Sequence, residues 1–292
     1  MKSITTTSQN VRLDRISIVW SLISLALLFL LYSQVLHALI LDWWTDPDYG
    51  YGFFVPLFSA YILWTQRHRW SQIEIKPSNF GLVVILTSVS LLFLATLGAE
   101  LFTTRFSLLL LLTGLILFLA GWKWLRGVSF ALAFLALMIP IPVIIYNQVT
   151  FPLQLLASRL ASSLLELVGV PVLRDGNVLV LSNYSLEVAE ACSGIRSFMS
   201  LIALAIAYGY LAEPRILLRC ILVVLIIPIA IATNAIRITA AGVLARHFGS
   251  AAAQGFLHEF SGWLTFLLAL FLVFVSHWIL LRFILSRQPA HA

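Results

Sequence analysis

Charged residues are scarce in this chain of 292 residues, at 10% of the total against 61% hydrophobic residues. A soluble domain needs more charge to cover its surface, so this composition excludes a soluble protein and indicates an integral membrane protein. Cysteine is scarcer still, with only Cys192 and Cys220. They are expected at opposite ends or depths of the membrane, which argues against a disulfide between them. Cys220 is expected to be a structural residue.

Metal-binding patterns and linkers are also missing. The histidines and acids lack ligand spacings such as HExxH, so no metal site and no cofactor are expected. No linker or low-complexity segment is long enough to separate a second domain. Residues 1–292 are therefore predicted to form a single transmembrane domain.

Long apolar runs predict an all-α membrane protein with a bundle of about eight transmembrane helices, because roughly 20 apolar residues cross a bilayer. Seven runs cover 16–40, 80–99, 106–122, 128–146, 193–212, 216–236 and 263–281, and a shorter one covers 52–65. The first run is longer than a signal-peptide core and is not followed by small residues, so it is expected to be a retained anchor.

A further apolar stretch, residues 151–168, decides the topology, because counting it as a span would invert everything after it. Gln154, Ser158, Ser162 and Glu166 recur every four residues and give this helix a polar stripe. The stripe predicts an interfacial helix that lies along the membrane surface. The alternative is a span whose polar stripe faces the bundle interior.

The basic residues test this scheme, since cytoplasmic loops retain Lys and Arg. With eight spans, twelve of the eighteen basic residues share one side, and nine of the twelve acids lie opposite. We assign the basic side, with both termini, to the cytoplasm. Its basic residues are Lys2, Arg12, Arg15, Arg67, Arg69, Lys76, Lys123, Arg126, Arg215, Arg219, Arg282 and Arg287. The formal charge of +6 thus reflects topology and gives no reason to expect nucleic-acid binding.

The longest outer loop, residues 147–191, ends in an extended segment. Residues 178–181 and 185–188 are rich in β-formers and are separated by turn residues, which predicts one or two short strands. The segment leads directly to Cys192 at the start of the sixth span.

Cys192 lies in EACSGIRS, where a helix start favours a thiolate. A helix end contributes only about 0.3 to 1 kcal/mol, less than the roughly 1.36 kcal/mol of one pKa unit. A cation or a base must therefore lie close to the thiol. Arg237 in TNAIRI and His258 in FLHEFSGW are expected at the same depth. Together they could supply a nucleophile, a general base and an oxyanion or carboxylate ligand.

Each candidate also has a structural interpretation. Cys192 could be a small core residue, Arg237 could extend to the interface, and His258 could be a satisfied polar group. Arg196, one turn after Cys192, competes for the role of the arginine. Glu187, Glu190 and Glu259 could orient His258 or simply be solvated. The other histidines, including His277, have no sequence neighbours that suggest chemistry.

The blocks EACSGIRS, NAIRI and HEFSGW, in this order over the last three spans, resemble the exosortases of the exosortase and archaeosortase family. The resemblance implies a membrane cysteine protease or transpeptidase. Its substrates would be exported proteins with a C-terminal sorting tail: a Pro-Glu-Pro type motif, a transmembrane helix and a basic cluster. Such enzymes usually accompany exopolysaccharide genes. Cys192 matches the family's nucleophile, Arg237 its arginine and His258 its histidine.

We add Arg196, Asn234 and Glu190 as candidate substrate-binding residues. The active site is expected on the outer face, with membrane lipid and the tailed protein as partners. One departure is that Gly50, Tyr51 and Gly52 stand where the family has a serine-histidine-glycine run, so no histidine function is transferred there. Two other classes remain open: a transporter whose charges line a path, and a membrane polysaccharide polymerase or ligase.

Overall fold

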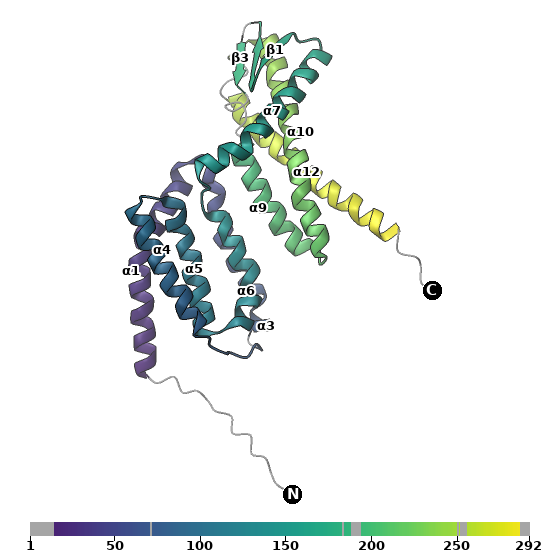
Figure 1. Ribbon diagram of the computed structural model, residues 1–292. Helices are drawn as coiled ribbons and strands as arrows, with labels where there is room; N and C mark the ends of the chain where they lie inside the picture. Colours follow the sequence, from purple (N-terminus) through teal and green to yellow (C-terminus); the bar gives the residue numbers. More distant parts are fainter. Residues whose placement is uncertain are drawn as a thin grey trace.

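The computed structural model describes residues 15–70, 72–182, 184–187, 194–249, 251 and 256–286, and shows a mostly helical, polytopic membrane protein (Figure 1). Its elements are α1 (Arg15–Thr45), η1 (Pro47–Phe53), α2 (Phe54–Thr65), α3 (Arg67–Trp70), α4 (Phe80–Leu97), α5 (Leu101–Leu119), α6 (Trp122–Phe134), η2 (Leu135–Met138), α7 (Val143–Leu167), β1 (Val172–Asp175), β2 (Val178–Leu181), β3 (Tyr184–Glu187), α9 (Gly194–Ala212), α10 (Ile216–Phe248) and α12 (Phe256–Ser286).

Fewer helices than the expected eight are long and apolar enough to cross a membrane by themselves. Among the described residues, five meet that condition, in α1, α4, α5, α10 and α12. A sixth is reached only if α6 and α7, which are bent by 86°, count as one span. The other expected spans correspond to shorter helices: α2 has 12 residues, and the apolar part of α9 runs over Phe198–Ala212.

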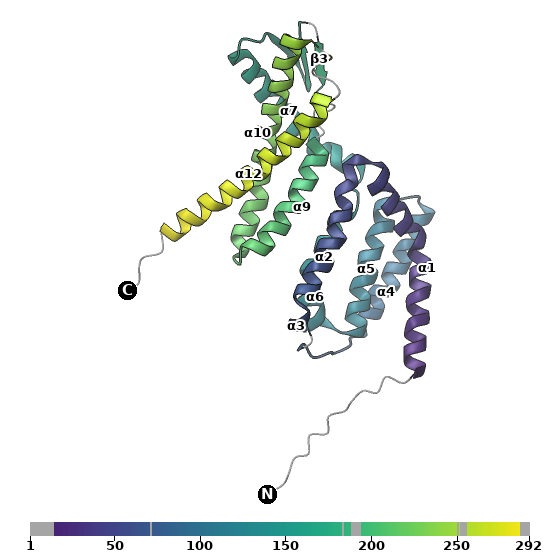
Figure 2. The same ribbon diagram turned by 180° about the vertical axis from the view of Figure 1, so that it is seen from behind.

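The first bundle contains α1, α2 and α4 to α6 (Figure 2). Small and polar residues stabilise its helix contacts. A Cβ on Gly81 of α4 would lie 2.3 Å from the backbone nitrogen of Phe118 on α5, so glycine permits this close approach. The Tyr32 hydroxyl of α1 lies 3.0 Å from both Ser88 Oγ of α4 and Ser107 Oγ of α5. Within an apolar bundle, these hydrogen bonds fix which faces meet.

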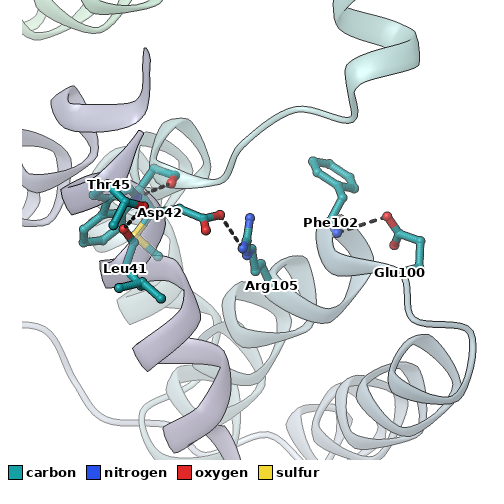
Figure 3. Close-up of polar contacts among 8 residues, drawn as sticks. Leu41, Asp42, Thr45, Glu100, Phe102 and Arg105 are labelled. Atoms are coloured by element: carbon teal, nitrogen blue, oxygen red, sulfur yellow. Dashed lines mark hydrogen bonds and ion pairs between the residues drawn. The ribbon is translucent and has the colours of Figure 1, made fainter. Parts of the chain in front are cut away.

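Charged groups secure one end of this bundle, as Figure 3 shows. Arg105 of α5 is buried and donates a hydrogen bond of 2.5 Å to Asp42 of α1. Glu100 caps α5 by accepting from the amides of Phe102 and Thr103. Hydrogen bonds from Thr103 hold the pKa of Glu100 below its ordinary value.

The chain turns sharply between α6 and α7, where the sequence reads Ile139-Pro140-Ile141-Pro142. Proline lacks the amide that a helix needs and disfavours helical geometry in the residue before it. The expected span at 128–146 is therefore wrong as a single helix, since α6 and η2 end at Met138 and α7 starts afresh at Val143.

Part of the polar stripe of α7 contacts protein. Ser158 and Ser162 are buried, and Ser158 Oγ donates to the Gly176 carbonyl oxygen at 3.1 Å. Gln154 is half-buried, and Glu166 at the end of the stripe is exposed. The stripe is therefore covered in its middle by the sheet turn and open at its end.

A three-stranded antiparallel sheet follows, in the order β1-β2-β3. The strand at 178–181 is confirmed, the second expected strand is shifted by one residue to Tyr184–Glu187, and β1 is additional. Gly176 adopts a φ of +59° in the turn between β1 and β2, a conformation that suits glycine.

The second bundle consists of α9, α10 and α12, and α10 is its longest member. The expected end of the seventh span at 236 is wrong, because α10 continues to Phe248. Its last turns pack on α7 and the sheet, where Ile238 of α10, Leu165 of α7 and Leu179 of β2 share a buried core. Arg246 of α10 also donates to the carbonyl oxygen of Gly169.

Candidate functional site

Arg237 lies on α10 where this helix passes between α12 and the core beneath the sheet. Its side chain is 5% exposed, so the guanidinium is almost completely withdrawn from solvent. Nε donates a hydrogen bond of 3.3 Å to Ser261 Oγ of α12. A buried cation held in this way needs polar partners or an anionic ligand.

A narrow cavity of about 30 Å³ lies beside Arg237, enclosed by α9, α10 and α12. Thr233, Asn234 and Arg237 of α10 and Thr265 of α12 provide its polar lining. Phe198 and Leu201 of α9, together with Ala230, Phe266 and Ala269, complete it with apolar surface. Roughly one or two water-sized groups fit such a volume, so the cavity can hold an oxygen atom or a small anionic group beside the guanidinium.

The structure describes the predicted site residues to different extents. Asn234 is half-buried and lines the same cavity as Arg237, one helical turn before it. His258 belongs to α12 and precedes Ser261 by three residues, which places the two on one helical face. Arg196 belongs to the first turn of α9. The side chains of Arg196 and His258 lie outside the described part of the chain.

Cys192 and Glu190 lie outside the described residues altogether. α9 begins at Gly194, two residues after Cys192, and its Phe198 contributes to the cavity wall. The other cysteine, Cys220, is exposed in the first turns of α10, well before Arg237 in that helix.

The polar lining can bind an oxyanion or a carboxylate. Arginine presents N–H groups in a fixed fork and stays protonated, so it stabilises negative charge without taking part in proton transfer. Within the described residues, no group of three or more His, Cys, Asp or Glu side chains could hold a metal ion.

A second polar cluster, which the sequence did not reveal, joins Tyr208 of α9, His277 of α12 and Glu213 of the turn between α9 and α10. The Tyr208 hydroxyl lies 2.7 Å from His277 Nδ1, and His277 Nε2 lies 3.4 Å from Glu213 Oε2. Neither partner is a sequence neighbour of His277, so the residues around it in the chain do not indicate this cluster. A histidine within an apolar span was itself a signal, because ionisable residues there need partners.

Glu213 is 3% exposed, and it accepts a hydrogen bond of 2.9 Å from the Arg215 amide. Burial by itself would raise the pKa of Glu213. The Arg215 amide and His277 outweigh this effect, and the pKa of Glu213 is lowered. Glu213 therefore stays ionised and holds α9, α10 and α12 together at the end of the bundle remote from the sheet.

The fold thus defines a polytopic helical membrane protein with a buried arginine beside a small, partly polar cavity. The family model described as Transmembrane exosortase (Exosortase_EpsH) matches residues 43–275, and the chain belongs to this family. Comparison with curated proteins and with solved structures gives no match. Membership of the family implies a membrane transpeptidase that processes sorting tails.

Proposed function

We propose that this protein is a membrane-embedded cysteine transpeptidase or protease with Cys192 as nucleophile, His258 as general base and Arg237 as the anion-binding residue. Its substrate is an exported protein whose C-terminal tail has a Pro-Glu-Pro type motif, a transmembrane helix and a basic cluster. The reaction takes place at the outer face of a bacterial cytoplasmic membrane, with both termini of the enzyme in the cytoplasm.

The observation that carries the proposal is the buried Arg237 beside a small cavity to which three helices contribute. Each of these helices also bears, or directly follows, one member of the proposed set: Cys192 precedes α9, Arg237 lies on α10 and His258 lies on α12. The Arg237 to Ser261 hydrogen bond joins the α10 residue to the turn of α12 that follows His258. Arg237 and His258 belong to helices that line this cavity, and Cys192 precedes the third by two residues, which supports a common site for these three residue types.

In the proposed reaction, His258 accepts the thiol proton and the Cys192 sulfur attacks the scissile carbonyl carbon. The C–N bond then breaks, the leaving amine takes the proton from His258, and a thioester remains on Cys192. Water or an acceptor amine attacks the thioester and regenerates the thiol. Arg237 either stabilises the oxyanion of the tetrahedral intermediate or binds the glutamate of the substrate motif. Arg196, Asn234 and Glu190 are proposed to contact the substrate.

Replacement of Cys192 by Ala tests the proposal. The protein is co-expressed with a tailed substrate, and mass spectrometry identifies the new C-terminus of the product, and with it the acyl acceptor. Cys192→Ala is expected to leave the substrate uncut, while the matched thiol variant Cys220→Ser cuts it as the wild type does. Cleavage that persists in Cys192→Ala would refute the assigned nucleophile. A transporter would tolerate both substitutions.

A further inference from the structure

A wide apolar groove opens beside α2, α9 and α12 and is not used by the proposed chemistry. Its volume is about 570 Å³, far larger than that of the cavity at Arg237, and its lining is almost entirely apolar. On α2 the lining residues are Phe54, Leu57, Phe58 and Tyr61, which follow the i, i+3, i+4, i+7 spacing of one helical face. The groove therefore runs along the helix rather than across it.

The groove and the Arg237 cavity are lined by neighbouring turns of α9. Leu201 of α9 lines the cavity, and Leu204, Tyr208 and Leu211 line the groove. The spacing of three, four and three residues keeps all of them on one face. Ten residues separate Leu201 from Leu211, a rise of about 15 Å at about 1.5 Å per residue.

The same is true of α12. Phe266 lines the cavity, and Leu270 and Phe274 line the groove, again on one face because they are four residues apart. On two neighbouring helices, the residues that line the groove thus follow directly after those that line the cavity, although no residue lines both.

The walls of the groove are preformed. Tyr208 is fixed by the hydrogen bond of its hydroxyl to the buried His277, and its ring packs edge-on against Phe274 with centroids 4.8 Å apart. On the opposite wall, Phe58 packs on Phe134 of α6 with centroids 4.9 Å apart. Rigid walls lower the entropic cost of binding, which favours recognition of a specific rigid partner.

We infer that this groove binds the transmembrane helix of the sorting-tail substrate, an inference that rests on the proposed function. In such a tail the cleavage motif directly precedes the helix, so a motif with one oxygen bound at Arg237 places the first turns of the helix beside the neighbouring groove. The apolar lining matches a helix of aliphatic residues. The stretch from Leu201 to Leu211 would contact roughly ten residues of a helix, about half of a membrane span.

Photo-crosslinking tests the docking. A photoreactive amino acid replaces Leu57, which lines the groove and is 70% exposed, in a Cys192→Ala chain that keeps the substrate uncut. The control position is Leu86 of α4, which is 60% exposed and lies outside the groove. The probe is a co-expressed protein that ends in a Pro-Glu-Pro motif, an apolar helix and a basic cluster.

Adducts between position 57 and the probe's helix are expected in at least tenfold excess over those at position 86. Equal yields at both positions, or adducts at position 57 with only lipid or a second copy of the enzyme, would overturn the docking site. Cleavage is measured separately with Cys192 intact. Cleavage without groove adducts refutes the docking alone, while groove adducts without cleavage refute the proposed chemistry alone.

Discussion

Replacement of Arg237 by Lys separates recognition by a planar guanidinium from recognition by charge. Arg237 is 5% exposed and its Nε donates to Ser261 Oγ, so the guanidinium is desolvated and its plane is held. Lysine keeps the positive charge, but one ammonium cannot occupy the position of Nε and present two parallel N–H groups at the same time.

The magnitude follows from this geometry. Loss of one preorganised donor to a developing oxyanion costs about 2.7 to 4 kcal/mol, or about 100- to 1,000-fold in kcat. Arg237→Lys is expected to lose activity by this factor. Ser261→Ala removes the hydroxyl that accepts from Nε, for which a loss of about tenfold is expected, equivalent to about 1.4 kcal/mol. Ser261→Thr keeps the hydroxyl and is expected to recover most of the activity.

The assay measures product formation from a tailed substrate by the purified enzyme in lipid nanodiscs, with thermal unfolding of each variant recorded in parallel. A lowered kcat with an unchanged Tm is the expected signature of Arg237→Lys. Turnover within threefold of the wild type would refute the use of the guanidinium fork. A parallel fall of Tm and activity in Ser261→Ala would instead assign Ser261 a purely structural role.

Three further predictions concern stability and the thiols. Because the pKa of Glu213 is lowered in the folded chain, its ionised form stabilises the fold above the ordinary pKa of 4.5, and this stabilisation is lost as the pH falls through the lowered value. Glu213→Gln should therefore flatten the decline of Tm below pH 4.5, and an unchanged profile would contradict the assignment. Gly81→Ala should lower the free energy of unfolding by about 1 to 3 kcal/mol, because the added Cβ would clash with the α5 backbone. The control is Gly98→Ala, where the nearest contact of the added Cβ is an ordinary 3.5 Å, so thermal unfolding should change little. Cys220 is exposed, so a thiol reagent can modify it in the folded protein. Modification of Cys220 alone should leave substrate cleavage unchanged. Loss of cleavage would contradict the assignment of Cys220 as a structural residue.

Several helices could be placed from the sequence because the bilayer imposes a local rule. Each apolar run must be long enough to cross the hydrocarbon core, so α4 at 80–97 and α5 at 101–119 lie close to the expected 80–99 and 106–122. The length of the apolar run does not predict the helix ends where a helix breaks or continues beyond the run. α10 becomes more polar after residue 236, yet it continues, because Ile238, Gly242 and Ala245 pack into the core with α7 and the sheet.

The strand β1 was missed because little in its own residues marks it. Val172–Asp175 is mostly exposed and acquires its extended form by pairing with β2. β2 was recognisable because its alternate residues Leu179 and Leu181 are buried and its composition is that of a strand. Short strands of this kind depend on their partners more than on local preference.

The sequence by itself determined that this is a polytopic membrane protein, and its ordered blocks around Cys192, Arg237 and His258 pointed to the exosortase family. These properties follow from composition and from residues that are close together in the chain. Only the tertiary structure decided that Arg237 meets Ser261 and that His277 meets Glu213 and Tyr208. Partners that lie tens of residues apart depend on the rotation and depth of packed helices, and no local pattern encodes those quantities.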